Sequence, residues 1–285
     1  MAGGRNVKFE EKLVSAQQRN HSWLCVGLDV AHARMPLPLQ KTDEPMLSFA
    51  REIIDATKDL VCAFKPNLGF FLAEGVTGMA ALERLVRYIP SDIPIILDGK
   101  FGDIGSTAEQ YARGAFEAFG VDAVTLSPYV GADAIQPFLA YADKGAFVLA
   151  RTSNPGAGEF QNLVLEHGAK SEEGGTLYEM VVRKAMEWHR QGPGMCGLVV
   201  GATYPQELEH IRALAPDLLF LVPGVGSQGG DLAATVQHGP TAGGIGPVIN
   251  ASRSIMYASS QKDFAEAARK AALQLRDQVN ALRTA

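Results

Sequence analysis

The chain has few charged residues and no long apolar run. Charged side chains make up 20% of its 285 residues, a little below the usual ~25%. No apolar stretch approaches the ~18 residues that a membrane-spanning helix requires, so no membrane span is expected. The 26 basic and 31 acidic residues give a net charge of -5 and form no basic stripe. Nucleic acid is therefore not an expected partner.

Cysteine is also scarce, and no secretory signal is visible. The three cysteines, Cys25, Cys62 and Cys196, are widely spaced, and each stands inside an apolar run. We expect buried, reduced thiols rather than a disulfide framework. The first residues lead into a polar helical pattern without the apolar core of a signal peptide, so no secretory signal is expected. The reduced thiols indicate a cytoplasmic protein.

Catalytic histidine patterns and metal-ligand spacings are missing as well. The six histidines stand outside every motif described below, so no metal site is expected. Glycine, in contrast, is abundant: it makes up 30 of the 285 residues, about one in ten, against a typical share of ~7%. A hydrophobic content of 47% permits a large core. This composition excludes disorder, collagen and coiled coils.

Eight short apolar runs recur along the whole sequence. Most are continuous rather than alternating, as in strands of a parallel sheet that are buried on both faces. They are Trp23–Asp29, Val61–Lys65, Pro94–Asp98, Ala123–Ser127, Ala146–Arg151, Gly197–Gly201, Leu218–Val222 and Pro247–Asn250. Helical patterns separate them, so the sequence predicts an α/β fold, a (β/α)8 TIM barrel with a single domain over residues 1–285. A doubly wound sheet with the same strand count is the alternative.

The segments between the runs carry apolar residues at helical spacing. The predicted helices are Glu44–Lys58, Gly75–Tyr88, Ser106–Phe119, Ala132–Asp143, Leu177–Gln191, Pro205–Leu214 and Gln261–Arg283. Ser106 and Glu109 are three residues apart and predict a capping box. An extra N-terminal helix over Val7–Arg19 is expected to cover the bottom of the barrel.

Two segments are too long for ordinary barrel connections. Asn154–Thr176 and Gly224–Gly246 are rich in glycine and mostly without periodicity. They follow the fifth and seventh predicted strands. Both therefore belong to the end of the barrel where active sites form, and long loops in compact domains are usually functional.

The densest group of charged residues follows the third predicted strand. Asp98 and Lys100 are two residues apart, so they point to one side of the strand, into the barrel mouth. Asp103 lies just beyond, and Lys65 ends the neighbouring second strand. These four charges alternate in sign, which could keep a lysine protonated beside two carboxylates. Structural ion pairing is the alternative, and it is less favoured because Gly99 and Gly102 leave space around the charges.

Such a group of charges is suited to decarboxylation. A substrate carboxylate placed against the aspartates would be repelled, and its departure as CO2 would relieve that repulsion. A lysine could then stabilise and protonate the carbon left behind. Asp98 and Asp103 could also ligate Mg²⁺, but the two lysines would oppose a divalent cation.

Two motifs near the end of the chain are typical of a phosphate site. Gly224–Gly229 matches GxGxxG formally, but no acidic residue stands about 20 positions on, as a dinucleotide fingerprint requires. Loops after the seventh and eighth strands of barrels often bind phosphate. Ser252 and Arg253, after the eighth strand, supply a hydroxyl and a guanidinium suited to a phosphate dianion. A plain turn with a surface arginine is the alternative.

Two further strand ends carry polar residues. Thr152–Asn154 opens the long fifth loop, and its hydroxyls and amide could read a polar ring edge, although such residues also form ordinary turns. Asp29 ends the first predicted strand. It could bind a sugar hydroxyl or cap a loop.

In their order along the chain, these motifs resemble the orotidine 5'-phosphate decarboxylase family, and specifically its bacterial type 2 branch. The resemblance covers nearly the whole chain. It implies a homodimeric barrel with shared active sites and no cofactor, which converts orotidine 5'-monophosphate to UMP and CO2 in the last step of pyrimidine (UMP) biosynthesis. The matching residues are Asp98-x-Lys100-x-x-Asp103-Ile104 with Thr107, Phe64–Asn67, Thr152–Gly156, Pro223–Gly230 and Ser252–Ser254.

The resemblance also implies a role for each matching residue. Lys100 would be the general acid that protonates C6, Asp98 would face the departing carboxylate, and Lys65 would complete the charge network and touch the ribose. Asp103, Ile104 and Thr107 would reach into the partner subunit's site. The substrate-binding residues would be Asp29 for the ribose, Ser153 for the pyrimidine, and Gln228 and Arg253, beside Ser252, for the phosphate.

Three other functions fit parts of the pattern. A Mg²⁺-dependent sugar-phosphate decarboxylase or synthase of the same superfamily shares Asp-x-Lys-x-x-Asp but has an acidic residue where Lys65 stands. A Schiff-base lyase would need a lysine of lowered pKa, whereas neighbouring aspartates would keep Lys100 charged. A non-catalytic phosphate-binding barrel would not need four alternating charges.

Overall fold

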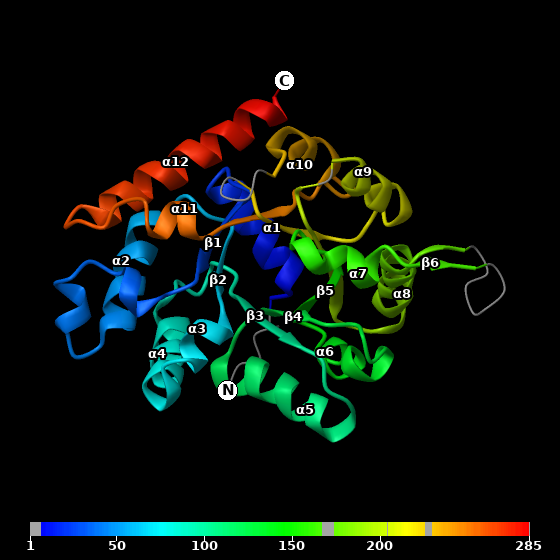
Figure 1. Ribbon diagram of the computed structural model, residues 1–285, viewed down its shortest axis with the longest axis horizontal. Helices are drawn as coiled ribbons and strands as arrows, with labels where there is room; N and C mark the ends of the chain where they lie inside the picture. Colours follow the sequence, from blue (N-terminus) through cyan, green and yellow to red (C-terminus); the bar gives the residue numbers. More distant parts are fainter. Residues whose placement is uncertain (1–6, 167–173, 204, 226–229, 285) are drawn as a thin grey trace.

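The eight predicted strands form one parallel sheet that curves into a barrel (Figure 1). This computed structural model describes residues 7–166, 174–203, 205–225 and 230–284. The strands are β1 (Leu24–Leu28), β2 (Ala63–Pro66), β3 (Ile96–Phe101), β4 (Ala123–Leu126), β5 (Gly145–Arg151), β8 (Met195–Val200), β9 (Phe220–Pro223) and β10 (Val248–Ala251). Their hydrogen-bonded order is β2-β1-β10-β9-β8-β5-β4-β3. Each predicted strand is therefore confirmed.

The two end strands of this order meet and close the barrel. β2 and β3 are joined by isolated parallel bridges, Phe64 with Ile95 and Asn67 with Asp98. The backbone amide of Phe64 donates to the carbonyl oxygen of Pro94 at 3.0 Å. This closure supports the (β/α)8 barrel over the doubly wound alternative. It also explains the continuous apolar runs, since strands such as β1 and β8 are buried along their whole length.

The N-terminal helix α1 (Phe9–Arg19) covers the bottom of the barrel, as predicted. Phe9 and Leu13 are buried in an apolar cluster against the starts of several strands. The Phe9 ring meets the ring of Phe147 edge-on, with centroids 5.8 Å apart. The strand residues in this cluster include Ala63, Ile96, Ala123, Met195 and Val248. The opposite end, formed by the carboxyl ends of the strands, is left for a functional site.

The remaining helices surround the barrel (Figure 1). They are α2 (Pro45–Thr57), α3 (Leu68–Leu72), α4 (Gly75–Tyr88), α5 (Gly105–Arg113), α6 (Gln136–Leu139), α7 (Gly158–Gln161), α8 (Leu177–Gln191), α9 (Pro205–Leu214), α10 (Leu232–His238), α11 (Arg253–Met256) and α12 (Phe264–Arg283). The predicted bounds of α4, α8 and α9 are the observed ones. The predicted helix over Ala132–Asp143 is a 3-10 turn followed by the single turn of α6. No described helix is long and apolar enough to cross a membrane.

The capping box predicted at Ser106 is wrong. α5 begins at Gly105, whose φ is +55°, so Ser106 already lies inside the first helical turn. Glycine adopts this φ freely and starts the helix earlier than the sequence pattern indicates. The same pattern does act at α8, where the side chain of Glu179 accepts a hydrogen bond from the amide of Thr176 at 2.8 Å.

Both long loops contain short elements of secondary structure. Asn154–Thr176 contains α7 and the antiparallel pair β6 (Val164–Leu165) and β7 (Gly175–Thr176), which project from the barrel as an arm (Figure 1). The second segment, Gly224–Gly246, contains α10. The loops were therefore predicted in the right places but with too little structure. Two-residue strands and single-turn helices are too short to show a hydrophobic period.

The three cysteines are buried free thiols, as predicted. Burial raises the pKa of Cys25 and of Cys196 to about 12. Burial also raises the pKa of Cys62 well above its ordinary value. Cys25 and Cys62 lie in the apolar cluster with Phe9, and Cys196 lies in the larger core cluster, so all three pack as small apolar side chains.

Candidate active site

Three of the four predicted charged residues meet at the carboxyl end of the barrel. Asp98 stands on β3 and Lys65 on the adjacent β2, with Lys65 Nζ 2.6 Å from Asp98 Oδ2. Lys100 Nζ contacts the other carboxylate oxygen, Oδ1. One carboxylate therefore binds two ammonium groups that come from two neighbouring strands.

The backbone of β3 is bent at Lys100. Lys100 has a φ of +46°, in the left-handed region that a lysine rarely adopts, and the pairing of β3 with β4 shifts register between Leu97 and Phe101. Thr125 of β4 stabilises the bend, because its hydroxyl accepts from the Lys100 amide at 3.0 Å and donates to Asp98 Oδ1 at 2.9 Å. Backbone conformations of this kind cluster at functional sites.

The electrostatics of the group favour an ionised Asp98 and a protonated Lys65. Burial alone would raise the pKa of Asp98, but the ammonium groups of Lys65 and Lys100 outweigh it and hold that pKa well below its usual range. Burial alone would lower the pKa of Lys65, yet the carboxylates of Asp98 and Asp29 raise it above its ordinary value. Lys65 and Asp98 have side chains only 5% and 10% exposed, whereas the Lys100 side chain is 52% exposed.

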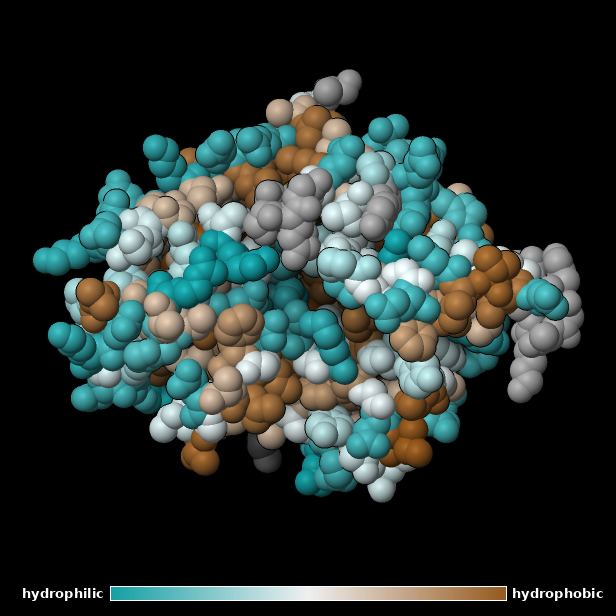
Figure 2. Space-filling model, in the orientation of Figure 1, coloured by the Kyte–Doolittle hydropathy of each residue, from teal (hydrophilic) through white to brown (hydrophobic). Residues whose placement is uncertain are grey.

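A cavity of about 360 Å³ opens beside these charges. Ser153 lines it, so the predicted pyrimidine-binding residue and Lys100 face the same space. Its apolar wall consists of Leu149, Val199, Leu221 and Pro223. Figure 2 shows hydrophilic side chains around a hollow near the middle of the molecular face in view. A few polar groups above an apolar wall suit a small heterocyclic ligand.

Asp29, just beyond the end of β1, carries an unsatisfied oxygen. Its Oδ1 is buried and has no hydrogen-bond partner within the described part of the chain. The main-chain oxygen of Asp29 accepts from the hydroxyl of Tyr257 at 2.9 Å, and that hydroxyl accepts from the amide of Ala31 at 2.7 Å. Buried polar atoms usually have partners, so a ligand hydroxyl is a natural partner for Oδ1.

The predicted phosphate-binding residues are described only in part, because Gln228 lies outside the described residues. Ser252 and Arg253 follow β10, and Arg253 is exposed at the start of α11. The Ser252 hydroxyl accepts from Asn250 Nδ2 at 3.3 Å. A Cβ at Gly27 would lie 1.9 Å from Ser252 Oγ, so glycine is needed there for β1 to approach this turn.

Asp103, Ile104 and Thr107 do not join the charged group of their own chain. All three are exposed, in the segment that leads from β3 into α5. The carboxylate of Asp103 accepts a hydrogen bond from the amide of Ile104 at 2.8 Å. Ile104 is 54% exposed, which is high for a large apolar residue. Within one described chain, the expected group of four charges therefore has three members.

Two polar residues at the cavity have no counterpart among the predicted site residues. Thr125 lies inside a predicted strand, and its polarity within an apolar run was a signal that could have marked it. Gln161 lies on α7, in the segment that shows no periodicity, and nothing local distinguishes it. Thr152 and Asn154 line the same cavity beside Ser153.

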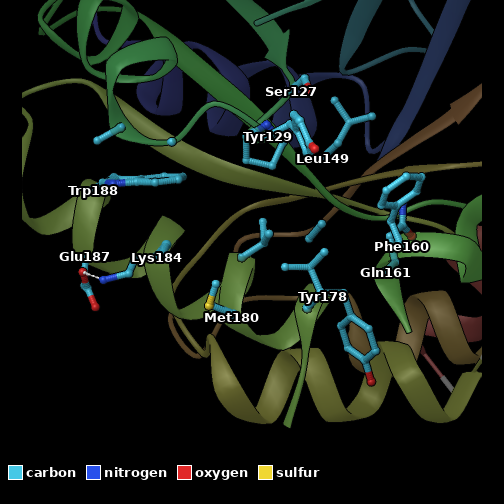
Figure 3. Close-up of a pocket in the computed structure, with 16 residues that line it drawn as sticks. Ser127, Tyr129, Leu149, Phe160, Gln161, Tyr178, Met180, Lys184, Glu187 and Trp188 are labelled. Atoms are coloured by element: carbon cyan, nitrogen blue, oxygen red, sulfur yellow. Dashed lines mark hydrogen bonds and ion pairs between the residues drawn. The ribbon is translucent and has the colours of Figure 1, made fainter. Parts of the chain in front are cut away.

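A second, larger cavity of about 790 Å³ lies outside the barrel, against α8 (Figure 3). Its lining is mostly apolar and aromatic and includes Tyr129, Phe160, Tyr178, Met180 and Trp188. Leu149 and Gln161 line both cavities. The charged pair at this second cavity, Lys184 and Glu187, lies at 2.8 Å on the surface of α8. The smaller cavity holds the charges and is therefore the candidate active site.

The donor set does not fit a metal ion. In the described ranges, no group of three or more His, Cys, Asp or Glu residues could hold one. Both oxygens of Asp98 are already bound by lysine ammonium groups. Such a set favours an anionic ligand over a divalent cation.

The chain is similar to known proteins over nearly its full length. The family model described as orotidine 5'-phosphate decarboxylase / HUMPS family matches residues 22–271. The orotidine 5'-phosphate decarboxylase of Ralstonia pickettii (strain 12J) is 50% identical over 281 residues, which cover 97% of this chain and 100% of that protein. The enzyme of the same name from Roseiflexus castenholzii is 51% identical over 276 residues, with 96% and 98% covered.

Solved structures agree with these relatives. The structure of Leishmania donovani OMP decarboxylase has a TM-score of 0.82 at 39% identity and covers 98% of this chain and 100% of its own. Leishmania donovani UMP synthase has a TM-score of 0.84 at 40% identity over 98% of this chain, which spans 57% of that longer protein. The chain therefore belongs to the orotidine 5'-phosphate decarboxylase / HUMPS family.

Proposed function

We propose that this chain converts orotidine 5'-monophosphate to UMP and CO2 without a cofactor, as the last step of UMP biosynthesis. The observation that carries the proposal is the Asp98 carboxylate held between Lys65 and Lys100 at the edge of a cavity. Relatives that share half of its residues over nearly the whole length are orotidine 5'-phosphate decarboxylases.

The charged group accounts for the chemistry of this reaction. Asp98 faces the substrate carboxylate, and two anions close together in a partly buried site repel each other. When the bond between C6 and the carboxylate carbon breaks, CO2 leaves and the electron pair stays on C6. Lys100 then transfers an ammonium proton to C6 and regains a proton from water. Lys65 keeps Asp98 ionised, because the pair lies at 2.6 Å in a buried position.

The rest of the substrate is assigned to the residues that the family resemblance names for it. The buried Oδ1 of Asp29, which has no partner among the described residues, accepts a hydrogen bond from a ribose hydroxyl close to Lys65. Ser153 binds the edge of the pyrimidine. The phosphate is assigned to Gln228, Ser252 and Arg253, far from the reacting carbon. Binding energy from such a remote group can close loops over the substrate and lower the barrier.

We also propose a homodimer with shared active sites. Asp103, Ile104 and Thr107 are exposed side by side, and no described residue of their own chain draws them into the charged group. Exposed apolar residues such as Ile104 are typical of the core of an interface. Asp103 would then supply the fourth charge to the partner's site.

The cytoplasm is the compartment that we assign to this enzyme. Its three cysteines are free and buried, and no pair of them forms a disulfide. Free thiols are typical of reducing compartments. The assignment rests on this cysteine chemistry together with the proposed role in nucleotide synthesis.

Decarboxylation in the presence of a chelator tests the proposed function. Purified protein is incubated with orotidine 5'-monophosphate and EDTA, and UMP is measured by chromatography. We expect UMP to form at the same rate with and without EDTA. A strict requirement for Mg²⁺ would instead favour the metal-dependent decarboxylases or synthases of the superfamily. Trapping of a covalent adduct by borohydride would favour a Schiff-base lyase.

A further inference from the structure

Gln161, the last residue of α7, is hydrogen-bonded to the turn that follows β5. Its Oε1 accepts from the amide of Thr152 at 2.9 Å and from Arg151 Nη1 at 3.2 Å. Its Nε2 donates to the hydroxyl of Thr152 at 2.8 Å. One side-chain amide thus binds both the backbone and the side chain of the same residue, which fixes the position of the turn at its first residue.

The hydrogen bonds continue from Thr152 to the cavity. The Thr152 hydroxyl donates to Asn154 Oδ1 at 2.6 Å, so the orientation of the Asn154 amide depends on the hydroxyl that Gln161 holds. Ser153 lies between these two residues, and all three line the cavity beside Lys100. The order Gln161, Thr152, Asn154 is therefore a relay that ends at the substrate cavity.

The Arg151–Glu207 ion pair and Gly201 hold the relay in place from outside the cavity. Arg151 is 4% exposed, and its Nε and Nη2 lie 2.7 Å and 3.3 Å from the carboxylate of Glu207. Because Arg151 presents only donors, the oxygen of the Gln161 amide must face it, and the nitrogen must face Thr152. On the other side, a Cβ at Gly201 would lie 3.0 Å from the Ser153 amide nitrogen, so the turn packs tightly against the end of β8.

The adjacent residue of α7 faces elsewhere. Phe160 lines the larger cavity, and its ring meets the ring of Tyr129 edge-on, with centroids 6.5 Å apart. Figure 3 shows Phe160 and Gln161 together at one end of that cavity. The short helix thus contacts the loop after β4 through Phe160 and the active-site cavity through Gln161. This attachment keeps the Gln161 amide within reach of the turn.

We propose that Gln161 is a positioning residue that holds Thr152–Asn154 in the conformation that recognises the pyrimidine of the substrate. The inference rests on the proposed function, since it takes the cavity to be the site of the base. It adds that recognition of the base depends on a side chain of the long loop after β5. Loss of the amide should therefore weaken binding of the base and leave binding of ribose phosphate unchanged.

Binding of two probes separates these effects. UMP carries the base, and ribose 5-phosphate lacks it. For Gln161→Leu, calorimetry should show about tenfold weaker binding of UMP, the size expected for loss of a partly buried hydrogen bond, and an unchanged Kd for ribose 5-phosphate. Gln161→Glu keeps the two accepted bonds and should lose less UMP affinity than Gln161→Leu. If Gln161→Leu fails to fold, as judged by circular dichroism, the two Kd values of Gln161→Glu are compared with those of the unaltered chain. Weaker binding of UMP with unchanged binding of ribose 5-phosphate is again the expected result.

The matched control is Gln191→Leu, at the exposed end of α8, which should bind both probes as the unaltered chain does.

Thr152→Val removes the middle of the relay. The double variant combines Gln161→Leu with Thr152→Val. Its loss of UMP affinity should equal the larger of the two single losses, because both changes break the same series of hydrogen bonds. Additive losses would show that Gln161 binds the base directly and would overturn the positioning role.

Two further outcomes also count against the inference. UMP binding by Gln161→Leu as tight as that of the unaltered chain would overturn it. Equal weakening of both probes would mean that the site is loosened in general, which would overturn it too. Failure of the unaltered chain to form UMP from orotidine 5'-monophosphate is a different result, since it rejects the proposed function itself.

Discussion

Lys100 combines a proposed catalytic role with an unfavourable backbone conformation. Its φ of +46° lies in a region that costs roughly 1–2 kcal/mol for a residue with a Cβ. The cost is offset by the hydrogen bonds of Thr125 to the Lys100 amide and to Asp98. The bend turns the Lys100 ammonium back onto the carboxylate two residues earlier.

Replacing Lys100 separates chemistry from conformation. Lys100→Ala should fold but lose decarboxylation by at least about 10²-fold, because the proton donor to C6 is gone. Lys100→Gly should be equally inactive but more stable than Lys100→Ala by about 1 kcal/mol, since glycine adopts a positive φ freely. UMP formation and urea unfolding are the measurements. Turnover near the normal rate would remove Lys100 as the acid, and equal stability of the two variants would argue against strain.

The Asp98 carboxylate should make stability depend on pH at the acid end. Burial opposes its ionisation, but Lys65 and Lys100 hold its pKa below the usual range. Its contribution to stability is therefore fully present above the unfolded-state pKa of ~4 and is lost as the pH falls toward the folded-state pKa. Asp98→Asn should lower the free energy of unfolding by about 3 kcal/mol at pH 7 but by only about 2 kcal/mol at pH 3.

Urea unfolding at the two pH values measures this difference. Asp277→Asn is the control, because Asp277 is 57% exposed and pairs with Arg276 at the surface. Its effect should stay within ~0.5 kcal/mol at both pH values. An effect of Asp98→Asn that does not change between pH 7 and pH 3 would contradict a lowered pKa.

The helix α1 contributes stability at the end of the barrel opposite the site. Phe9→Ala should lower the free energy of unfolding by about 3–5 kcal/mol, because Phe9 is 1% exposed and fills the barrel bottom. KM for the substrate should not change, since the charges lie at the other end. Glu11→Ala, on the exposed side of α1, serves as the control. A shift in KM with little loss of stability would show that α1 acts on the site instead.

The strands and long helices could be predicted from the sequence, whereas the short elements could not. The eight barrel strands are continuous apolar runs because both of their faces are buried. α4, α8 and α9 each contain enough turns to show a helical period. By contrast, α3, α7 and α11 are single turns whose form depends on tertiary contacts. The start of α5 depends on the positive φ of Gly105, which no apolar pattern reveals.

The same division applies to the site. Lys65, Asp98 and Lys100 could be predicted to meet because parallel strands place their carboxyl ends at one edge. Thr125 and Gln161 could not, since their roles depend on hydrogen bonds that arise only when β4 and α7 are packed in place. The exposed position of Asp103 likewise depends on how the chain leaves β3 for α5.

Shared sites in a dimer can be tested by mixing inactive subunits. Asp103→Ala removes the charge proposed to enter the partner's site, and Lys100→Ala removes the acid of its own site. In an equal mixture after subunit exchange, about a quarter of all sites should contain both unaltered residues, so about a quarter of normal UMP formation should return. Each variant alone should stay inactive. A mixture no more active than its parents would argue against sharing.

The closure of the barrel has a mechanical consequence. Between β2 and β3 the described residues form isolated bridges rather than a continuous ladder, at Phe64 with Ile95 and Asn67 with Asp98. Across this same seam runs the buried contact of Lys65 with Asp98, at 2.6 Å. The ion pair that is proposed to drive the reaction thus also joins β2 to β3. A chain in which β2 and β3 have separated would lack the assembled site, so decarboxylase activity itself reports that the barrel is closed.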